Sequence, residues 1–435
     1  MKTLIKNVYT TATLLGMDEN STKEVEVLID GDKISKISST PIDDKVDKVI
    51  DGKGGFLSPG LCDPQVHFRE PGLEYKEDIE SGSKAAVKGG FTCVISMPNT
   101  SPTADNAEVV AFMANKAKEV ALCDVYPTGA VTKGLLGKEI VDYASMKNAG
   151  AIALTDDGKG VQSEDIFKQA MIEAQKLNLA ILDHSEDESL SAGGAIHKGE
   201  VSQKYNVKGI DSRSEAAHVE RGCRLSLETG CHYHVLHIST KESIEYVRKA
   251  KAQGARVTAE VSPHHLLLCD EDIPEREAGE LDPNWKMNPP LRSKEDREAC
   301  QKALVEGLID AIATDHAPHA PHEKAAPIEK APFGIIGLET AFPLIYTFFV
   351  KSKKISLDRC IDLMSKQAGE LFGLKIGRIT EGSVANLAIF DLKNEFEVHP
   401  DFFASKSKNS PFLGRKLLGK TMFTIYQGQC VYNGV

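Results

Sequence analysis

Hydrophobic and polar residues alternate in short runs at both ends of the chain. Near the start, the stretch EVEVLIDGDKISKI (24–37) alternates on either side of a DGD turn, which is typical of two antiparallel strands. The same pattern returns near the end, in GRITEGSVANLAIFDL (377–392) and TMFTIYQGQCVYNG (421–434). We therefore expect residues 1–57 and 379–435 to pair into one small β-sandwich satellite domain.

Between residues 58 and 378 the pattern changes to short apolar runs, each followed by a longer amphipathic stretch. The apolar runs predict buried strands, and the stretches between them predict helices. Strand and helix alternate eight times, which indicates an α/β fold of the (β/α)8 barrel type. The predicted strands are the segment that ends at His67, followed by FTCVISM (91–97), CDVYPTGAV (123–131), AIALT (151–155), LAILDH (179–184), YHVLHI (233–238), ARVTAEV (255–261) and IDAIAT (309–314).

Composition narrows the classes of function. Lysine and arginine total 52 against 63 aspartate and glutamate, a net charge of −11, and no basic tract is present. This balance argues against nucleic acid or a membrane surface as partner. We see no secretory signal and no apolar stretch long enough to span a bilayer. Nine cysteines without a C-x-x-C pair indicate reduced thiols and a cytoplasmic protein.

Polar residues stand at the carboxyl ends of the predicted strands, where barrel enzymes place their catalytic groups. Imidazoles and carboxylates that converge from separate strands supply the nitrogen and oxygen ligands of a zinc site, and leave carboxylates to handle protons. The residues in these positions are His67, Arg69, Asn99, Asp156, Asp157, His184, His237, His264, His265 and Asp315.

Each histidine also has a structural interpretation, because a lone histidine is more often a hydrogen-bonded core residue than a ligand. The strand period places His232 and His234 on the face opposite His237, so we expect these two to face the helical layer. His319 lies in a proline-rich loop after the last strand. We keep a role for it, because an anionic substrate needs a cationic or donor group at this rim.

Gln65 stands where a histidine would complete a His-x-His pair with His67, in the stretch DPQVHFREPG (63–72). Two imidazoles two residues apart on a strand point to the same face and can bind one ion. A neutral amide is a poorer zinc ligand than imidazole. We therefore expect a metal bound by His67 to be held less tightly, with or without Gln65 as a ligand.

The motifs resemble those of the amidohydrolase superfamily, and within it the barrel-type dihydroorotases that carry an aspartate bridge. Allantoinases and dihydropyrimidinases share the barrel but typically bridge their metals with a carbamylated lysine at the end of strand four, where this chain has aspartate. The matching stretches run from about residue 58 to 340. They are DPQVHFREPG, MPNT, TDDG, ILDHSED, VLHIST, SPHHL, MNPPLR and ATDHAPH with APFGIIGLET, and GRITEGSVANLAIFD extends the match into the satellite domain.

The resemblance implies a role for each matching residue. The first metal position would hold His67 and Asp315, with Gln65 as an additional candidate ligand, and Asp157 would bridge to a second metal on His184 and His237. Asp315 would also act as the proton-transferring base. The side chains of Arg69, Asn99, Asn288 and His319, with the backbone of Phe333 and Gly334, would contact the substrate.

The implied reaction is the zinc-dependent interconversion of dihydroorotate and N-carbamoyl-aspartate in pyrimidine biosynthesis, with one or two Zn²⁺ ions. Arg69 would bind the substrate carboxylate, which explains how an acidic protein binds an anion. A second interpretation is an inactive subunit that acts as a scaffold for aspartate carbamoyltransferase, and a third is a dihydropyrimidinase-like or allantoinase-like hydrolase. A homo-oligomer also fits the sequence.

Overall fold

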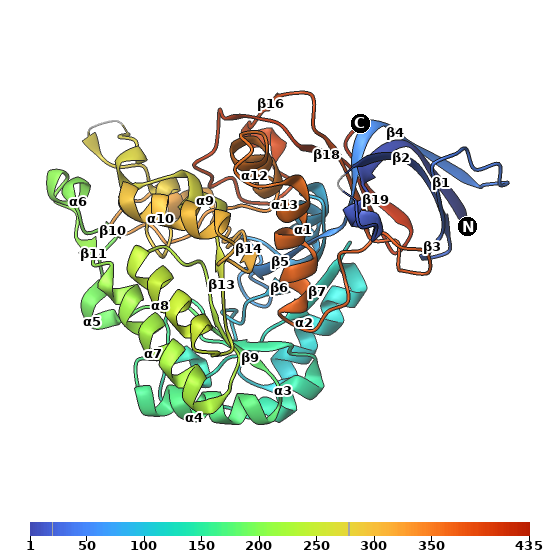
Figure 1. The fold of residues 1–435 in the computed structure, drawn as a ribbon. Helices are drawn as coiled ribbons and strands as arrows, with labels where there is room; N and C mark the ends of the chain where they lie inside the picture. Colours follow the sequence, from blue (N-terminus) through green and yellow to red (C-terminus); the bar gives the residue numbers. More distant parts are fainter. Residues whose placement is uncertain (20, 277–278) are drawn as a thin grey trace.

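The computed structural model describes residues 1–19, 21–276 and 279–435, and its centre is a barrel of parallel strands (Figure 1). Two arcs of strands, β5-β6-β7 and β8-β9-β12-β13-β14, close through parallel bridges between Val66 and His316 and between Gly129 and Leu154. The predicted (β/α)8 barrel is therefore confirmed. The strands are β5 (Leu61–Val66), β6 (Phe91–Ser96), β7 (Asp124–Pro127), β8 (Ala153–Thr155), β9 (Ala180–Asp183), β12 (Tyr233–Val235), β13 (Val257–Val261) and β14 (Ala311–Ile312).

A helix follows each barrel strand and packs outside it. Local signals in the sequence start these helices: the Asp78 side chain accepts from Ser81 N–H at the start of α1, and Ser163 accepts from Ile166 N–H at the start of α4. The eight barrel helices are α1 (Ile79–Lys88), α2 (Ala107–Val120), α3 (Tyr143–Ala149), α4 (Glu164–Lys176), α7 (Arg213–Thr229), α8 (Lys241–Ala252), α10 (Lys294–Val305) and α13 (Leu357–Met364).

Shorter elements lie in the connections, chiefly in the loops that follow the strand ends. These elements are α5 (Glu188–Ser191), β10 (Ile196–His197), α6 (Glu200–Lys204), β11 (Gly209–Ile210), α9 (Pro263–Leu267), α11 (Pro321–Lys324), α12 (Ala341–Ile345) and α14 (Lys366–Glu370). Two of the sequence candidates, His264 and His265, lie in one of them, α9.

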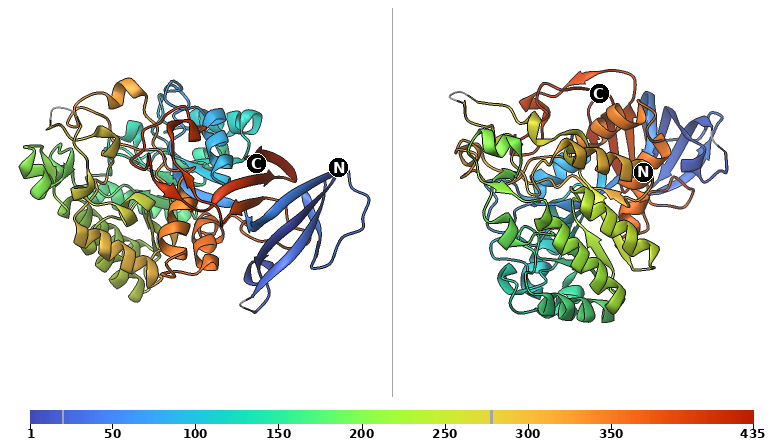
Figure 2. Two further views of the ribbon diagram at one scale, coloured as in Figure 1. Left: turned by 90° about the horizontal axis from the view of Figure 1, so that it is seen from above. Right: turned by 60° about the vertical axis from the view of Figure 1, so that its left-hand side comes forward.

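Both ends of the chain enter one β-rich domain beside the barrel, as predicted (Figure 2). Hydrogen bonds join all seven strands into one continuous sheet, whereas the expected sandwich implied two. The edge strand that contains Ile34 also contacts the chain just before Leu387, because Ile34 N–H donates to Ser383 O at 2.9 Å. In sheet order the strands are β19 (Gln429–Asn433), β18 (Lys420–Tyr426), β15 (Leu387–Asp391), β4 (Lys48–Pro59), β1 (Lys2–Thr11), β2 (Thr22–Asp30) and β3 (Lys33–Ser38).

The chain between β15 and β18 leaves this sheet and packs on the barrel. It contains the small pair β16 (Phe396–Glu397) and β17 (Lys416–Leu417). Ser407 Oγ donates to Lys76 O at 2.9 Å, and the Asn409 side chain donates to Ala317 O at 3.2 Å. Part of the segment predicted for the satellite therefore supports the loops that follow β5 and β14.

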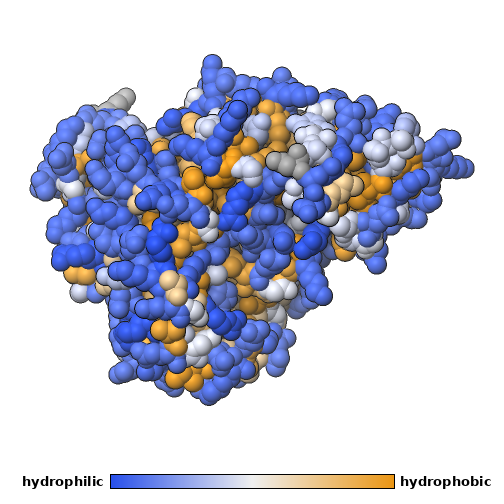
Figure 3. Space-filling model, in the orientation of Figure 1, coloured by the Kyte–Doolittle hydropathy of each residue, from blue (hydrophilic) through white to orange (hydrophobic). Residues whose placement is uncertain are grey.

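The surface is mostly hydrophilic on the face shown in Figure 3, where hydrophobic residues appear in small groups. Among the residues that the structure describes, no helix combines the length and the apolar character that crossing a membrane requires.

Candidate metal centre

Asp157, His184 and His237 form a buried cluster at the ends of β8, β9 and β12. One ligand atom from each residue lies within 4.8 Å of the others. His184 Nδ1 is 3.0 Å from His237 Nε2 and 3.4 Å from Asp157 Oδ1. Two imidazoles and a carboxylate in this arrangement match the three protein ligands of a catalytic metal site. The structure thus brings together the three residues expected around the second metal.

Glu186 orients His184, although the sequence analysis did not single it out. Glu186 Oε2 lies 3.1 Å from His184 Nε2 and accepts a hydrogen bond from Asn288 Nδ2 at 2.7 Å. A carboxylate at this nitrogen holds one proton there and directs Nδ1 to the cluster, where a metal ion would take the place of the other proton. Asn288, expected at the substrate, therefore contacts the carboxylate that orients a candidate metal ligand. The only signal for Glu186 was its position two residues beyond His184 in ILDHSED.

The electrostatics of the cluster favour a cation. Burial lowers the pKa of His184, but the carboxylates of Asp157 and Glu186 outweigh it and raise the pKa to about 10. Burial raises the pKa of Asp157, yet the surrounding histidines hold it well below its usual range. The buried carboxylate is thus balanced by protons on imidazole. A metal ion would replace those protons and release them on binding.

His67 links this cluster to Asp315. Its Nε2 lies 3.1 Å from both Asp157 Oδ2 and Asp315 Oδ1, and its Nδ1 lies 2.8 Å from Asn99 Oδ1. With Nδ1 donating to Asn99, Nε2 is the nitrogen that faces the two carboxylates, and a metal ion there would take the place of its proton. The residues expected at the first metal position, His67, Asp157 and Asp315, therefore meet at His67 Nε2, and Asn99 orients the His67 ring.

The Gln65 side chain reaches the same place. Its Nε2 donates to Asp157 Oδ2 at 3.3 Å. Its Oε1 is buried and has no hydrogen-bond partner among the described residues. Rotation of the amide exchanges nitrogen and oxygen and turns the oxygen toward Asp157. An unpartnered oxygen beside a buried carboxylate is what a cation would satisfy, so the donor set fits a metal at this position too.

Asp63 holds the ends of β5 and β14 together beneath His67 and Asp315, a role that the sequence analysis also missed. Its carboxylate accepts from Gln65 N–H at 3.1 Å and from both the N–H and the hydroxyl of Thr314. Burial raises the pKa of Asp63 to about 7, against the effect of these hydrogen bonds.

The expected substrate contacts gather at the rim beside the cluster. The Arg69 guanidinium is buried, and its Nε donates to Pro318 O at 3.3 Å. Burial lowers the pKa of Arg69 to about 10, so it carries a positive charge at neutral pH. His319 Nε2 donates to Phe333 O at 2.7 Å, and Asn409 Nδ2 donates to Gly334 O at 3.0 Å.

The backbone is strained where the site is built. Arg69, His237 and Asp315 have φ values of 61°, 33° and 49°, in the left-handed region that side chains other than glycine rarely adopt. Such conformations persist only where the surrounding structure fixes them, and they gather at functional sites. In each case the unusual turn aims a side chain into the barrel mouth.

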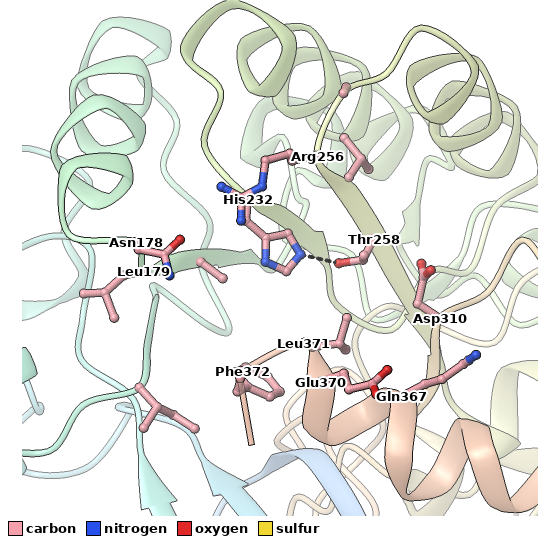
Figure 4. A pocket seen from close by; sticks show the side chains of 15 residues that line it. Asn178, Leu179, His232, Arg256, Thr258, Asp310, Gln367, Glu370, Leu371 and Phe372 are labelled. Carbon is pink, nitrogen blue, oxygen red and sulfur yellow. Dashed lines mark hydrogen bonds between the residues drawn. The ribbon is translucent and has the colours of Figure 1, made fainter. Parts of the chain in front are cut away.

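The expectation that His232 and His234 face the helical layer is wrong. Tyr233 faces that layer, because a Cβ on Gly222 of α7 would lie 2.1 Å from the Tyr233 ring. Its neighbours in the strand therefore point into the barrel, where both histidines hydrogen-bond to Thr258 Oγ1. Figure 4 shows His232 and Thr258 in a pocket lined mainly by residues at the strand starts. Asp157 follows the other end of its strand, β8.

Comparison with known proteins places the chain in a family. A family model described as Dihydro-orotase-like matches residues 54–243. A dihydroorotase of Geobacillus kaustophilus is 51% identical over 392 residues, which are 90% of this chain and 90% of that protein. A dihydroorotase of Halalkalibacterium halodurans is 48% identical over 99% of this chain and 98% of its own. The chain belongs to the dihydroorotase family.

Solved structures outside the dihydroorotase family share its fold. An L-hydantoinase (dihydropyrimidinase) from Arthrobacter aurescens superposes with a TM-score of 0.86 at 26% identity, over 99% of this chain and 96% of the other. A D-hydantoinase (dihydropyrimidinase) from Thermus sp. gives 0.83 at 25% identity, over 99% and 95%. Identity to these hydrolases is about half that to the dihydroorotases, so the comparisons confirm the family and the cyclic amidohydrolase class expected from the motifs.

Proposed function

We propose that this protein interconverts dihydroorotate and N-carbamoyl-aspartate with zinc in the centre formed by Asp157, His184 and His237. The observation that carries the proposal is the joining of this buried cluster to Asp315 through His67, with the Arg69 guanidinium at the same mouth. The site thus offers metal ligands, a carboxylate for proton transfer and a cation for an anionic substrate.

The metal position fits the residues that surround it. Asp157, His184 and His237 would hold one ion, and His67, Asp157 and Asp315, with Gln65, would hold another. A bound Zn²⁺ supplies Lewis-acid activation of water and of the ring amide carbonyl. Imidazole and carboxylate ligands suit zinc, although they also suit other divalent metals.

The protein's own residues position the substrate and move its protons. Arg69 pairs with the substrate carboxylate through a planar fork of donors. Asp315, held beside His67, takes a proton from the attacking water and returns it to the departing amide nitrogen. Ring closure runs through the same groups in reverse. The backbone of Phe333 and Gly334 offers polar groups at the rim of the site.

Turnover by the purified protein is the direct test. Ring opening of dihydroorotate, closure of N-carbamoyl-aspartate and bound metal should all be measured on one preparation. Turnover in both directions supports the proposal. A protein that turns over neither compound would contradict it and favour the scaffold for aspartate carbamoyltransferase. That partner, a homo-oligomer and the cytoplasmic location stay predictions.

Arg69→Met should impair the use of dihydroorotate selectively. Without the guanidinium the substrate carboxylate enters a buried site unpaired, so kcat/KM should fall roughly a hundredfold. Activity on dihydrouracil, an uncharged cyclic amide, should change far less. Steady-state kinetics with both substrates provide the measurement, and Arg415→Met, at an exposed position, is the matched control. Equal losses on both substrates, or dihydrouracil as the better substrate of the unaltered protein, would contradict this assignment.

Gln65→His should tighten metal binding at the His67 position. The new imidazole lies on the face that His67 already uses, and imidazole is a better zinc ligand than an amide. The gain in rate should be small, because the strand-end geometry is fitted to an amide. Zinc titration of the metal-stripped proteins measures the effect, with Gln253→His at the exposed end of α8 as control. Identical titrations of the variant and the unaltered protein would show that Gln65 does not limit this site.

A further inference from the structure

The loop that carries the proposed substrate contacts has too few backbone donors of its own. Between His319 and Phe333 the chain reads APHEKAAPIEKAP, with prolines at 321, 327 and 332. Proline has no N–H, so each one removes a backbone donor from the loop. Buried carbonyls require a partner. Two lysine side chains supply the partners of four carbonyls in this loop, those of Ile328, Glu329, Ala331 and Pro332.

Lys286 supplies one set of donors. Its side chain is buried, and Nζ donates to Ile328 O at 2.7 Å, to Ala331 O at 2.7 Å and to Glu329 O at 3.3 Å. The same ammonium lies 4.3 Å from the centre of the Phe333 ring, a distance at which a cation is attracted to an aromatic face. Lys286 therefore fixes the loop segment 328–331, which leads into Phe333.

Lys324 supplies the second set. Its buried Nζ donates to Pro283 O at 3.0 Å, to Lys286 O at 3.1 Å and to Pro332 O at 2.9 Å. The carbonyl of Lys286 also accepts from Gly334 N–H at 3.0 Å. Lys324 thus joins the segment before Asn288 to the residues on either side of Phe333.

Neither ammonium forms an ion pair with any residue that the structure describes. Each has three carbonyl acceptors, which matches the three protons of an ammonium group. A buried charge is costly unless it is paired or hydrogen-bonded, and here backbone carbonyls supply the hydrogen bonds. What the two lysines organise is the backbone next to the site.

We propose that Lys286 and Lys324 form a lysine clamp, a pair of positioning residues that hold the Phe333–Gly334 backbone in the conformation that binds substrate. The proposal rests on the proposed function, because it takes this backbone as a substrate contact. His319 belongs to the same unit, since its Nε2 donates to Phe333 O. The clamp touches the loop and acts on the substrate through it.

The clamp depends on protonation. Burial lowers the pKa of Lys324 to about 7 and that of Lys286 to about 8. Below these values each amine has three donors for three carbonyls, and as pH rises through them each loses one donor. The loop should therefore loosen at mildly alkaline pH. The charged groups around the pair that act on these pKa values are Glu329, Asp282, Glu323 and Arg69.

The test uses Lys324→Met and Lys286→Met in the full-length protein, with Lys330→Met as a control at an exposed position of the same loop. Both clamp variants should raise KM for dihydroorotate by about tenfold or more and change kcat less than threefold, because the catalytic groups stay in place. Bound metal should be unchanged. Lys330→Met should behave like the unaltered protein.

Trp285, the only tryptophan of the chain, gives a readout that does not need activity. It lies beside Lys286, so its fluorescence should shift as pH passes from about 7 to about 8 in the unaltered protein, and this transition should change in both clamp variants. If the protein did not use dihydroorotate, the proposed function would fail while this readout still tested the clamp. KM within twofold of the original in both variants would overturn the clamp. If the variants do not fold, the absence of a fluorescence transition in the unaltered protein would overturn it.

Discussion

Alanine at His237 is expected to remove at least one equivalent of metal and to lower kcat/KM by at least about a thousandfold. His237 Nε2 is 3.0 Å from His184 Nδ1, and no other imidazole of the described cluster can take its place. A three-ligand catalytic site cannot readily spare a ligand, and the loss of Lewis-acid activation removes several kcal/mol of transition-state stabilisation. His184→Ala should give the same result, because it removes the other imidazole.

Metal analysis by mass spectrometry and steady-state kinetics on the same preparations provide the measurements. His322→Ala is the matched control, since this histidine lies exposed in the loop after β14 and should retain metal and activity. Full metal content and full rate in both His184→Ala and His237→Ala would remove these residues from the metal centre.

Asp315→Asn is expected to lower kcat by about a thousandfold. The substitution keeps the shape of the side chain but removes its capacity to accept a proton from water. Asp315 Oδ1 is 3.1 Å from His67 Nε2, so metal at the His67 position should also bind less tightly. The Asp157–His184–His237 cluster keeps all of its ligands and should retain its metal. The variant therefore separates loss of proton transfer from loss of the whole metal centre.

Single-turnover rates and metal content should be measured together across a range of pH. An exposed position, Asp401→Asn, controls for the loss of a carboxylate. If the variant kept a near-normal kcat, a group other than Asp315 would have to be the base. A variant stripped of all metal would show that Asp315 is chiefly a ligand.

The sequence predicted the barrel well because its signals are local. A short apolar run followed by an amphipathic stretch marks a strand and its helix independently of the rest of the chain. The return of alternation at both ends likewise predicted a shared β-rich domain. The sequence did not predict that the chain around Asn409 leaves this domain and supports the loop at Gly334. That contact depends on tertiary packing of segments far apart in the sequence.

Within the site, the strand-end rule located the residues that meet in the cluster, but not the residues that hold them in place. The orientation of His232 was predicted wrongly because β12 ends at Val235 and the chain turns at His237 with a positive φ, so the two-residue period does not extend that far. Glu186 and Asp63 were missed for a related reason. They act by hydrogen bonds to ligands or to the strand beside them, and no spacing pattern distinguishes such carboxylates from surface ones.

The closure of the barrel between β5 and β14 has a consequence for how the protein matures. His67 and Asp315 are 248 positions apart, yet they meet at this seam, where His67 N–H donates to His316 O at 2.8 Å. The ribosome releases β5 early and β14 late, and a growing chain can order only what has emerged. Asp157, His184 and His237 are therefore synthesised before Asp315, the proposed base, exists. Catalytic competence is among the last properties that a nascent chain acquires.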